Sequence, residues 1–409
     1  MKTEIGNAML RTFKNPGLWI VSICTIVPSL RPMAKYLPSS IFFIAVPVYC
    51  IAAVGASAAF FRGLRSEKIP GFFRSKFFFG AVLAIITCVN FAGYPLADNL
   101  KKDMRGSDQD DAIIQTGQTL LSGHNPYHAH LYTGFPISPG PGIILLSIPF
   151  AAYTRYFLLT PCALLIMGLL IARTAGSFLF ASAFLALMGS SFAFWEIMIV
   201  GSDMIAIGLL FAMATLWLFS RQLRSHVPGN EPVKSALTVS SGIVEFFAVV
   251  IFSALVATSR ILFIGLVPLW SLLLFKINKR SALVFFCCTT IVTVALHYIF
   301  YIQDPHAYTP FHVIGKGKGL MGPILGAAGA ASTLAMGIVI FMRTRPTLPS
   351  WMMSLGLGCG VPLAFVALGD LITRNWAFAK WEGVNYLFVF VPIVYLHYIF
   401  DAATLKSAE

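Results

Sequence analysis

Four acidic side chains gather in one polar stretch of an otherwise apolar chain, residues 103–141. They are Asp103, Asp108, Asp110 and Asp111, whereas the whole chain of 409 residues holds only 16 Asp and Glu. Two neighbouring carboxylates near a low-dielectric surface raise each other's pKa, which favours a general base, so Asp110 and Asp111 are the first candidates for catalysis. The alternative is that these residues only cap a helix or face water.

The residues that follow these carboxylates predict a short amphipathic helix lying along a membrane surface. Residues 108–127 read DQDDAIIQTGQTLLSGHNPY, and apolar side chains recur about two helical turns apart, at Ile113 and Leu120. Gly123 is expected just past the C-terminal end, and Pro126 stops the helix. The acidic residues then lie near the N-terminus, where the helix dipole favours an anion.

Three histidines follow in the same stretch, at His124, His128 and His130. Their spacing is compatible with a zinc site. Loop histidines beside tyrosines such as Tyr127 more often form hydrogen bonds or stack on sugar rings, so we expect no metal here. Asn125, which precedes Pro126, belongs to the same candidate sugar-binding group.

Basic side chains in other loops are candidates for binding a phosphate. Residues 315–319 read GKGKG, and Lys316 and Lys318 with the glycine amides could contact a phosphate. The alternative is a flexible, solvated loop, and the sequence is not a Walker motif. Arg260 begins an apolar run, either to meet a phosphate or to reach lipid headgroups.

Two further segments leave a structural and a functional interpretation open. Residues 374–386 contain aromatic residues typical of a membrane interface, but Arg374 and Lys380 could also bind phosphate while the rings stack on sugar. Asp203 is costly at membrane depth unless it faces a cavity or a partner, so it is either a site residue or a structural one.

The composition predicts a membrane protein. The chain is 57% hydrophobic and 11% charged, with a mean hydropathy of +0.80. A soluble domain carries about 25% charged residues. The apolar segments are long and do not alternate, which favours an all-α polytopic fold with about 11–13 spans over a β-barrel. The net charge of +13 is typical of basic loops beside anionic lipid, which argues against nucleic-acid binding.

The basic loops predict the topology. Loops 62–76, 220–235, 276–280 and 342–346 are rich in Lys and Arg and are expected inside, which leaves loops 95–141, 302–320 and 370–383 outside. Four apolar runs lie between 95–141 and 220–235, where parity demands an odd number of crossings. Either one run fails to cross, the short 142–154 being the first candidate, or two runs are halves of one helix. The apolar runs are 17–30, 40–61, 77–94, 142–154, 157–172, 176–195, 197–219, 237–257, 261–275, 281–301, 321–341, 351–369 and 384–400.

The polar loop resembles the first outside loop of the GT-C class of membrane glycosyltransferases, in the branch that contains bacterial and mycobacterial mannosyltransferases. The shared order is an acidic residue, a short helix, Gly-x-Asn-Pro-Tyr and a proline-rich turn. Gln115 stands where that branch has a Tyr, and the loop follows the third apolar run instead of the first. The matching residues are Asp111, Gly123, Asn125, Pro126 and Tyr127, with Pro136, Pro139 and Pro141 in the turn.

The resemblance implies residues 1–76 as an added N-terminal hairpin and 77–409 as a GT-C-like domain. It further implies transfer of a monosaccharide from a polyprenyl-phosphate donor to a lipid-linked or cell-envelope glycan acceptor, without a cofactor. The expected location is the bacterial inner membrane, with the site facing the periplasm. The expected roles are catalysis by Asp111 and Asp110, phosphate binding by Arg260, Lys316, Lys318, Arg374 and Lys380, and sugar or acceptor binding by Asp108, His124, Asn125, Tyr127, His128 and Asp203.

The main rival interpretation is a secondary transporter or a lipid or glycolipid flippase. Such a protein is also helical, basic and polytopic, but it is expected to have broken helices in two related halves and charges at mid-membrane. The sequence has no recognisable halves, and its charges gather in loops. A non-catalytic assembly subunit is a second rival, which would not need the acidic cluster.

Overall fold

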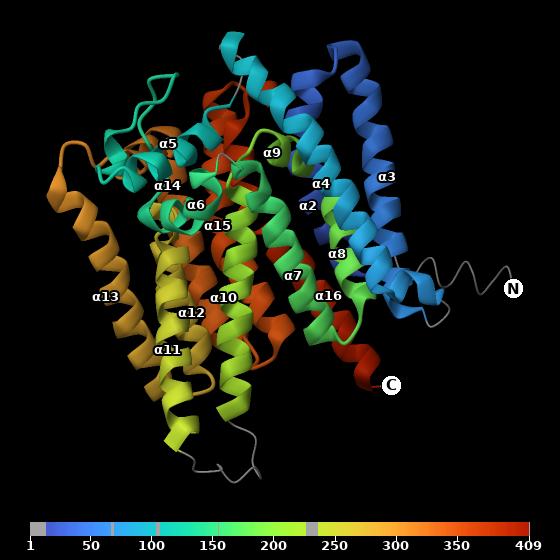
Figure 1. Ribbon diagram of the computed structural model, residues 1–409. Coiled ribbons are helices and arrows are strands. Elements are labelled where there is room, and N and C mark those ends of the chain that lie inside the picture. Colours follow the sequence, from blue (N-terminus) through green and yellow to red (C-terminus); the bar gives the residue numbers. More distant parts are fainter. Residues whose placement is uncertain (1–13, 67–68, 104–106, 154, 226–235, 409) are drawn as a thin grey trace, which may run out of the picture.

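The computed structural model describes residues 14–66, 69–103, 107–153, 155–225 and 236–408. This part of the chain is helical and contains no β-strand, so the all-α prediction is confirmed (Figure 1). The α-helices are α2 (Pro16–Tyr36), α3 (Ser39–Arg65), α4 (Lys76–Asn99), α5 (Gln109–Leu121), α6 (Pro141–Ala152), α7 (Leu159–Ala175), α8 (Phe178–Gly189), α9 (Phe192–Ile199), α10 (Met204–Ser225), α11 (Ala236–Ala257), α12 (Leu266–Phe275), α13 (Lys279–Gln303), α14 (His312–Arg343), α15 (Leu348–Thr373) and α16 (Val391–Ala408).

Short 3₁₀ helices join several of these elements. They are η1 (Gly71–Arg74), η2 (Leu100–Asp103), η3 (Pro126–His128), η4 (Tyr156–Leu158), η5 (Ile261–Gly265), η6 (Phe378–Lys380) and η7 (Glu382–Val389).

Within the described ranges, nine helices are long and apolar enough to cross a membrane, or ten if a bent pair is one span. The bent pair is α8 and α9, which meet at 84°. The chain is therefore a multi-pass membrane protein. The suspected run 142–154 forms the 12-residue α6, which is too short to cross a membrane.

Helices α2 and α3 of the N-terminal segment pack against each other, and α2 is part of the core. Asn15 caps α2 by accepting a hydrogen bond from the backbone N–H of Gly17, at 2.9 Å. Leu18 and Val21 on α2 are fully buried in the main apolar core. Thr25 lies 2.7 Å from the Tyr395 hydroxyl on α16, so the first and last long helices are in direct contact.

The polar stretch gathers at one end of the bundle. Figure 1 shows α5, α6 and α9 at the upper end, whereas the C-terminus and the adjoining ends of α10 and α11 lie at the opposite end. Most of the predicted inside loop 220–235 lies outside the described residues, as do the first 13 residues of the predicted hairpin.

Two glycines let the turn before α6 pack against the C-terminal end of α11. A Cβ atom at Gly142 would lie 1.7 Å from the Leu255 carbonyl oxygen, and one at Gly140 would lie 2.0 Å from the Thr258 carbonyl oxygen. The backbone N–H of Gly140 also donates to the Ser259 carbonyl at 2.8 Å. Only glycine permits this approach, which holds the turn before α6 against the end of α11.

Candidate functional site: a large basic cavity at the polar end

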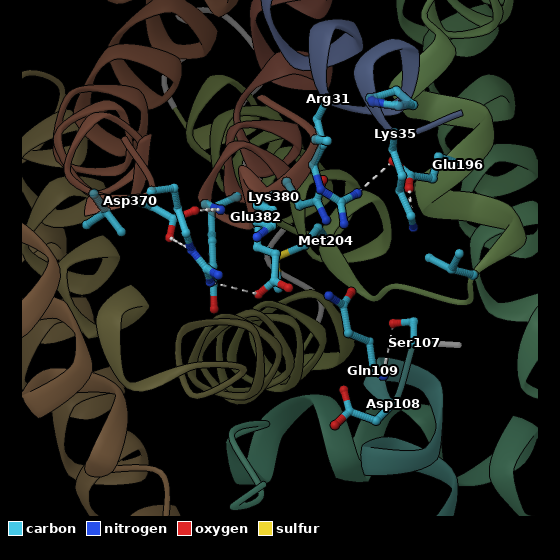
Figure 2. A pocket seen from close by; sticks show the side chains of 18 of the residues that line it. Arg31, Lys35, Ser107, Asp108, Gln109, Glu196, Met204, Asp370, Lys380 and Glu382 are labelled. Carbon is cyan, nitrogen blue, oxygen red and sulfur yellow. Dashed lines mark hydrogen bonds and ion pairs between the residues drawn. The ribbon is translucent and has the colours of Figure 1, made fainter. Parts of the chain in front are cut away.

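A cavity of about 2360 Å³ opens at the polar end, between α3, the ends of α2, α4, α5, α9, α14 and α15, and the 3₁₀ helices η6 and η7. Pockets for drug-sized ligands usually measure about 300–1,000 Å³, so this cavity has room for a lipid-sized ligand or for two ligands together. Figure 2 shows charged side chains from several of these elements pointing into it.

The lining carries more positive than negative side chains. Its seven cations are Arg31, Lys35, Arg260, Lys316, Lys318, Arg374 and Lys380, and its four carboxylates are Asp108, Glu196, Asp370 and Glu382. A water-poor cleft with an excess of one sign concentrates ligands of the other sign. The cavity therefore favours an anionic ligand.

One part of the cation excess lies on α14 and η6. Lys316, Lys318 and Lys380 are exposed, and no hydrogen bond or ion pair to another described residue is seen for any of them. Arg374 is 3.3 Å from the Asp370 carboxylate and 3.8 Å from that of Glu382. All five predicted phosphate-binding cations thus line the cavity, and three of them have no counter-charge among the described residues.

The prediction that Lys316 and Lys318 lie in a loop is wrong. The GKGKG segment forms the first turns of α14, and the connection from α13 covers only residues 304–311. The helix bends at Gly322, whose φ of 58° lies in the left-handed region. The lysine side chains are therefore presented by a helix whose glycines leave open space around them.

Arg260, the fifth predicted phosphate ligand, is already neutralised. Its guanidinium donates to both carboxylate oxygens of Asp203, each at 2.7 Å, and both side chains are buried. A further bond reaches Ser138 at 2.5 Å. Burial lowers the pKa of Arg260, but Asp203 and the nearby Tyr386 and Tyr156 together outweigh this effect, so the pKa is raised. This pair ties α10, η5 and the proline-rich turn together, which favours a structural role for both predicted site residues.

The predicted surface helix forms as α5, and its end follows the sequence signals. Gly123 has a φ of +80°, and its backbone N–H donates to the Leu120 carbonyl at 3.0 Å. At the other end Asp108 occupies the N-cap position, yet its side chain makes no capping hydrogen bond. Its carboxylate instead accepts a bond from the Thr133 hydroxyl at 2.5 Å. Asp108 lines the cavity, as Figure 2 shows.

The structure does not bring Asp110 and Asp111, the predicted catalytic pair, to the cavity wall. Asp110 is buried and accepts bonds from Tyr94 at 2.5 Å and Lys101 at 2.8 Å. Asp111 lies 3.0 Å from the same lysine, as does Asp98 at 2.7 Å. Burial raises the pKa of Asp110, against the opposing effect of Lys101. This cluster links α5 to α4. The Lys101 ammonium group lies among the three carboxylates, in the place that a metal cation would take.

The predicted sugar-binding residues of the next segment dock the loop onto α13. Asn125 donates to the Phe300 carbonyl at 3.3 Å, and the Tyr127 hydroxyl donates to Pro139 at 3.3 Å. His128 lies 3.0 Å from the Asp304 carboxylate. His124 is exposed, and none of the four predicted residues lines the cavity. Their contacts indicate a structural role.

Sequence reasoning missed a second charged group on the cavity wall. Arg31 and Lys35 of α2 lie 2.7 Å and 3.1 Å from the carboxylate of Glu196 on α9, and the Tyr36 hydroxyl donates to it at 3.2 Å. One signal was present: α2 ends with two cations at the end predicted to be outside, where the positive-inside rule expects few.

Comparisons with protein-family models, with curated proteins and with solved structures gave no match. The resemblance of the polar loop to GT-C enzymes therefore rests on the loop motif itself.

Proposed function

We propose that the chain is a GT-C-type membrane glycosyltransferase that moves a monosaccharide from a polyprenyl-phosphate donor to a lipid-linked or cell-envelope glycan acceptor. The proposed setting is the outer face of a bacterial inner membrane. One observation carries the proposal: a cavity between apolar helices has both a basic wall and, at α5, a carboxylate without a cationic partner among the described residues. These are the two groups that transfer from a lipid phosphate requires.

In the proposed reaction, the acceptor hydroxyl gives its proton to the carboxylate of Asp108. The acceptor oxygen forms a bond to the anomeric carbon, and the bond from that carbon to the phosphate oxygen breaks. The electron pair leaves with the phosphate, which is released as polyprenyl phosphate. Lys316, Lys318 and Lys380 stabilise the charge that develops on this leaving group.

Asp108 takes the place of Asp110 and Asp111 as the proposed base because it lines the cavity. The other carboxylates of the lining have cations nearby: Glu196 has two, and Asp370 and Glu382 share Arg374. A nearby cation favours the charged form of a carboxylate and weakens it as a base. Among the described residues, Asp108 is the lining carboxylate for which no such cation is seen.

The experiment that tests the proposal separates transfer from transport. Purified chain in detergent receives a polyprenyl-phosphate sugar and a membrane-lipid extract, and free polyprenyl phosphate is measured. The proposal predicts release that depends on the extract. A flippase is the second candidate, favoured by exposed apolar side chains on the cavity lining such as Val48 and Leu96. Flux of intact donor across sealed vesicles without any release would support the flippase.

A further inference from the structure

The cluster of Arg31, Lys35 and Glu196 indicates where the acceptor of the proposed transfer could bind. It lies on the cavity wall formed by α2 and α9, elements other than the α14 and η6 that carry the lysines. Figure 2 shows Lys35 and Glu196 on one side of the view and Asp370 on the other. The cavity thus has cations contributed by two separate parts of the chain.

The cluster retains a positive charge after its internal pairing. Glu196 accepts bonds from Arg31, Lys35 and Tyr36, so one carboxylate faces two cations. The side chain of Arg31 is only 11% exposed, and its Nε atom is buried without a hydrogen-bond partner in the described structure. A buried cation in excess of its counter-charge is costly unless an anion completes it.

The lining beside this cluster is apolar and open. Val48 on α3, Leu96 on α4 and Phe192 on α9 line the cavity, with 61%, 69% and 51% of their surfaces exposed. Small residues at Ala52 and Gly93 lie among them in the lining. A hydrocarbon chain fits such a surface. At the end of that surface, the phosphate headgroup of the same lipid would meet the cations of α2.

We propose that Arg31 and Lys35 bind the phosphate of an anionic lipid acceptor whose hydrocarbon chain lies along Val48, Leu96 and Phe192. This inference rests on the proposed transferase function and names its acceptor class. The donor phosphate occupies the lysines of α14 and η6, and the acceptor phosphate occupies the cluster on α2. The large cavity volume then serves two lipids that meet near Asp108.

The test measures lipid retention by the purified full chain. The protein is equilibrated with a mixture of phosphatidylglycerol and phosphatidylcholine, and native mass spectrometry gives the ratio retained. Arg31→Gln with Lys35→Gln should lower the preference for phosphatidylglycerol about tenfold, the scale of losing a charge-assisted hydrogen bond. Glu196→Gln should raise the preference, because it frees the two cations.

The matched control is Lys316→Gln with Lys318→Gln, which should leave the phosphatidylglycerol preference unchanged while weakening polyprenyl-phosphate binding. An unchanged ratio in the Arg31 and Lys35 variant would overturn the inference. If that variant does not fold, Glu196→Gln decides: a lower or unchanged preference there shows that the cluster is only an ion pair between α2 and α9.

The two proposals fail in different ways. Suppose that the wild-type chain retains phosphatidylglycerol selectively through Arg31 and Lys35 but releases no polyprenyl phosphate from the donor. The anionic-lipid site is then supported, and glycosyl transfer is contradicted. If the chain releases polyprenyl phosphate and the Arg31 and Lys35 variant has the same acceptor affinity as wild type, glycosyl transfer is supported and the proposed acceptor site is contradicted.

Discussion

At the scale of single residues, partners in space decide which charges are available for a ligand. Arg260 and Asp203 are 57 positions apart, and each looked like a separate site candidate in sequence. The structure joins them in a buried ion pair in which the Nη2 atom of Arg260 donates to both carboxylate oxygens of Asp203, so neither is free. Lys316 and Lys318 are also cationic but have no counter-charge among the described residues, and that difference makes them the better candidates for binding a phosphate.

The buried pair predicts a strong effect on stability. Asp203→Asn leaves the Arg260 charge buried without its carboxylate, which should cost about 3–5 kcal/mol. Unfolding of the detergent-solubilised chain, followed by tryptophan fluorescence, measures this loss. Asp203→Asn combined with Arg260→Met should recover much of the stability, because no unpaired charge remains. Equal stability of wild type and Asp203→Asn would show that the pair is not the structural tie described here.

The carboxylates at the start of α5 are expected to differ in role, with Asp108 acting in catalysis and Asp110 in stability. Asp108→Asn should lower transfer about 100-fold while the donor still binds, the usual scale for loss of a general base. Asp110→Asn should instead lower the melting temperature, because it weakens the buried contact with Lys101. Single-turnover rates and thermal unfolding separate the two effects. Normal turnover in Asp108→Asn, with a large loss in Asp111→Asn, would restore the original assignment to the Asp pair.

At the scale of elements, local sequence signals were sufficient to predict the end of α5 but not the start of α14. The Asn-Pro stop and Gly123 mark the end of α5 through backbone chemistry that involves neighbours in sequence. The glycines of 315–319 suggested a loop, since each costs a helix about 1 kcal/mol relative to alanine. The segment is helical nonetheless, and the non-helical Gly322 separates it from the apolar part of α14.

Two glycine substitutions test this account of the elements. Gly142→Ala should destabilise the chain strongly, because its Cβ would overlap the Leu255 carbonyl. The matched control is Gly317→Ala in α14, where nothing lies within 4 Å of the added Cβ, and it should be neutral or stabilising by up to about 1 kcal/mol. Thermal unfolding compares the two variants. A stable Gly142→Ala chain would contradict the close packing of α6 on α11.

At the scale of the whole molecule, hydropathy and charge were enough to predict an all-helical membrane protein with a polar end. They were not enough to predict the cavity, because its wall is assembled from elements between α2 and η7. Arg31 and Glu196 are 165 positions apart, and no local pattern links them. Nor do period and length reveal where a helix breaks, as between α8 and α9.

The topology gives a prediction for the whole chain. In a background without its seven cysteines, a cysteine at Ser122 should react with an impermeant reagent in intact cells, and one at Ser225 should not. The reason is that Ser122 ends α5 at the polar end, whereas Ser225 ends α10 at the other, predicted to be inside. Labelling of Ser225 alone would reverse the orientation and place the cavity on the inner face.

The most direct test of the central claim is photo-crosslinking of a polyprenyl phosphate that carries a photoreactive group beside its phosphate. We expect crosslinked peptides that contain Lys316 and Lys318 on α14 and Lys380 on η6, and loss of the crosslinks in the Lys316→Gln, Lys318→Gln variant. Crosslinks confined to the surface of α13, or unchanged in that variant, would contradict the claim that this basic wall holds the donor phosphate.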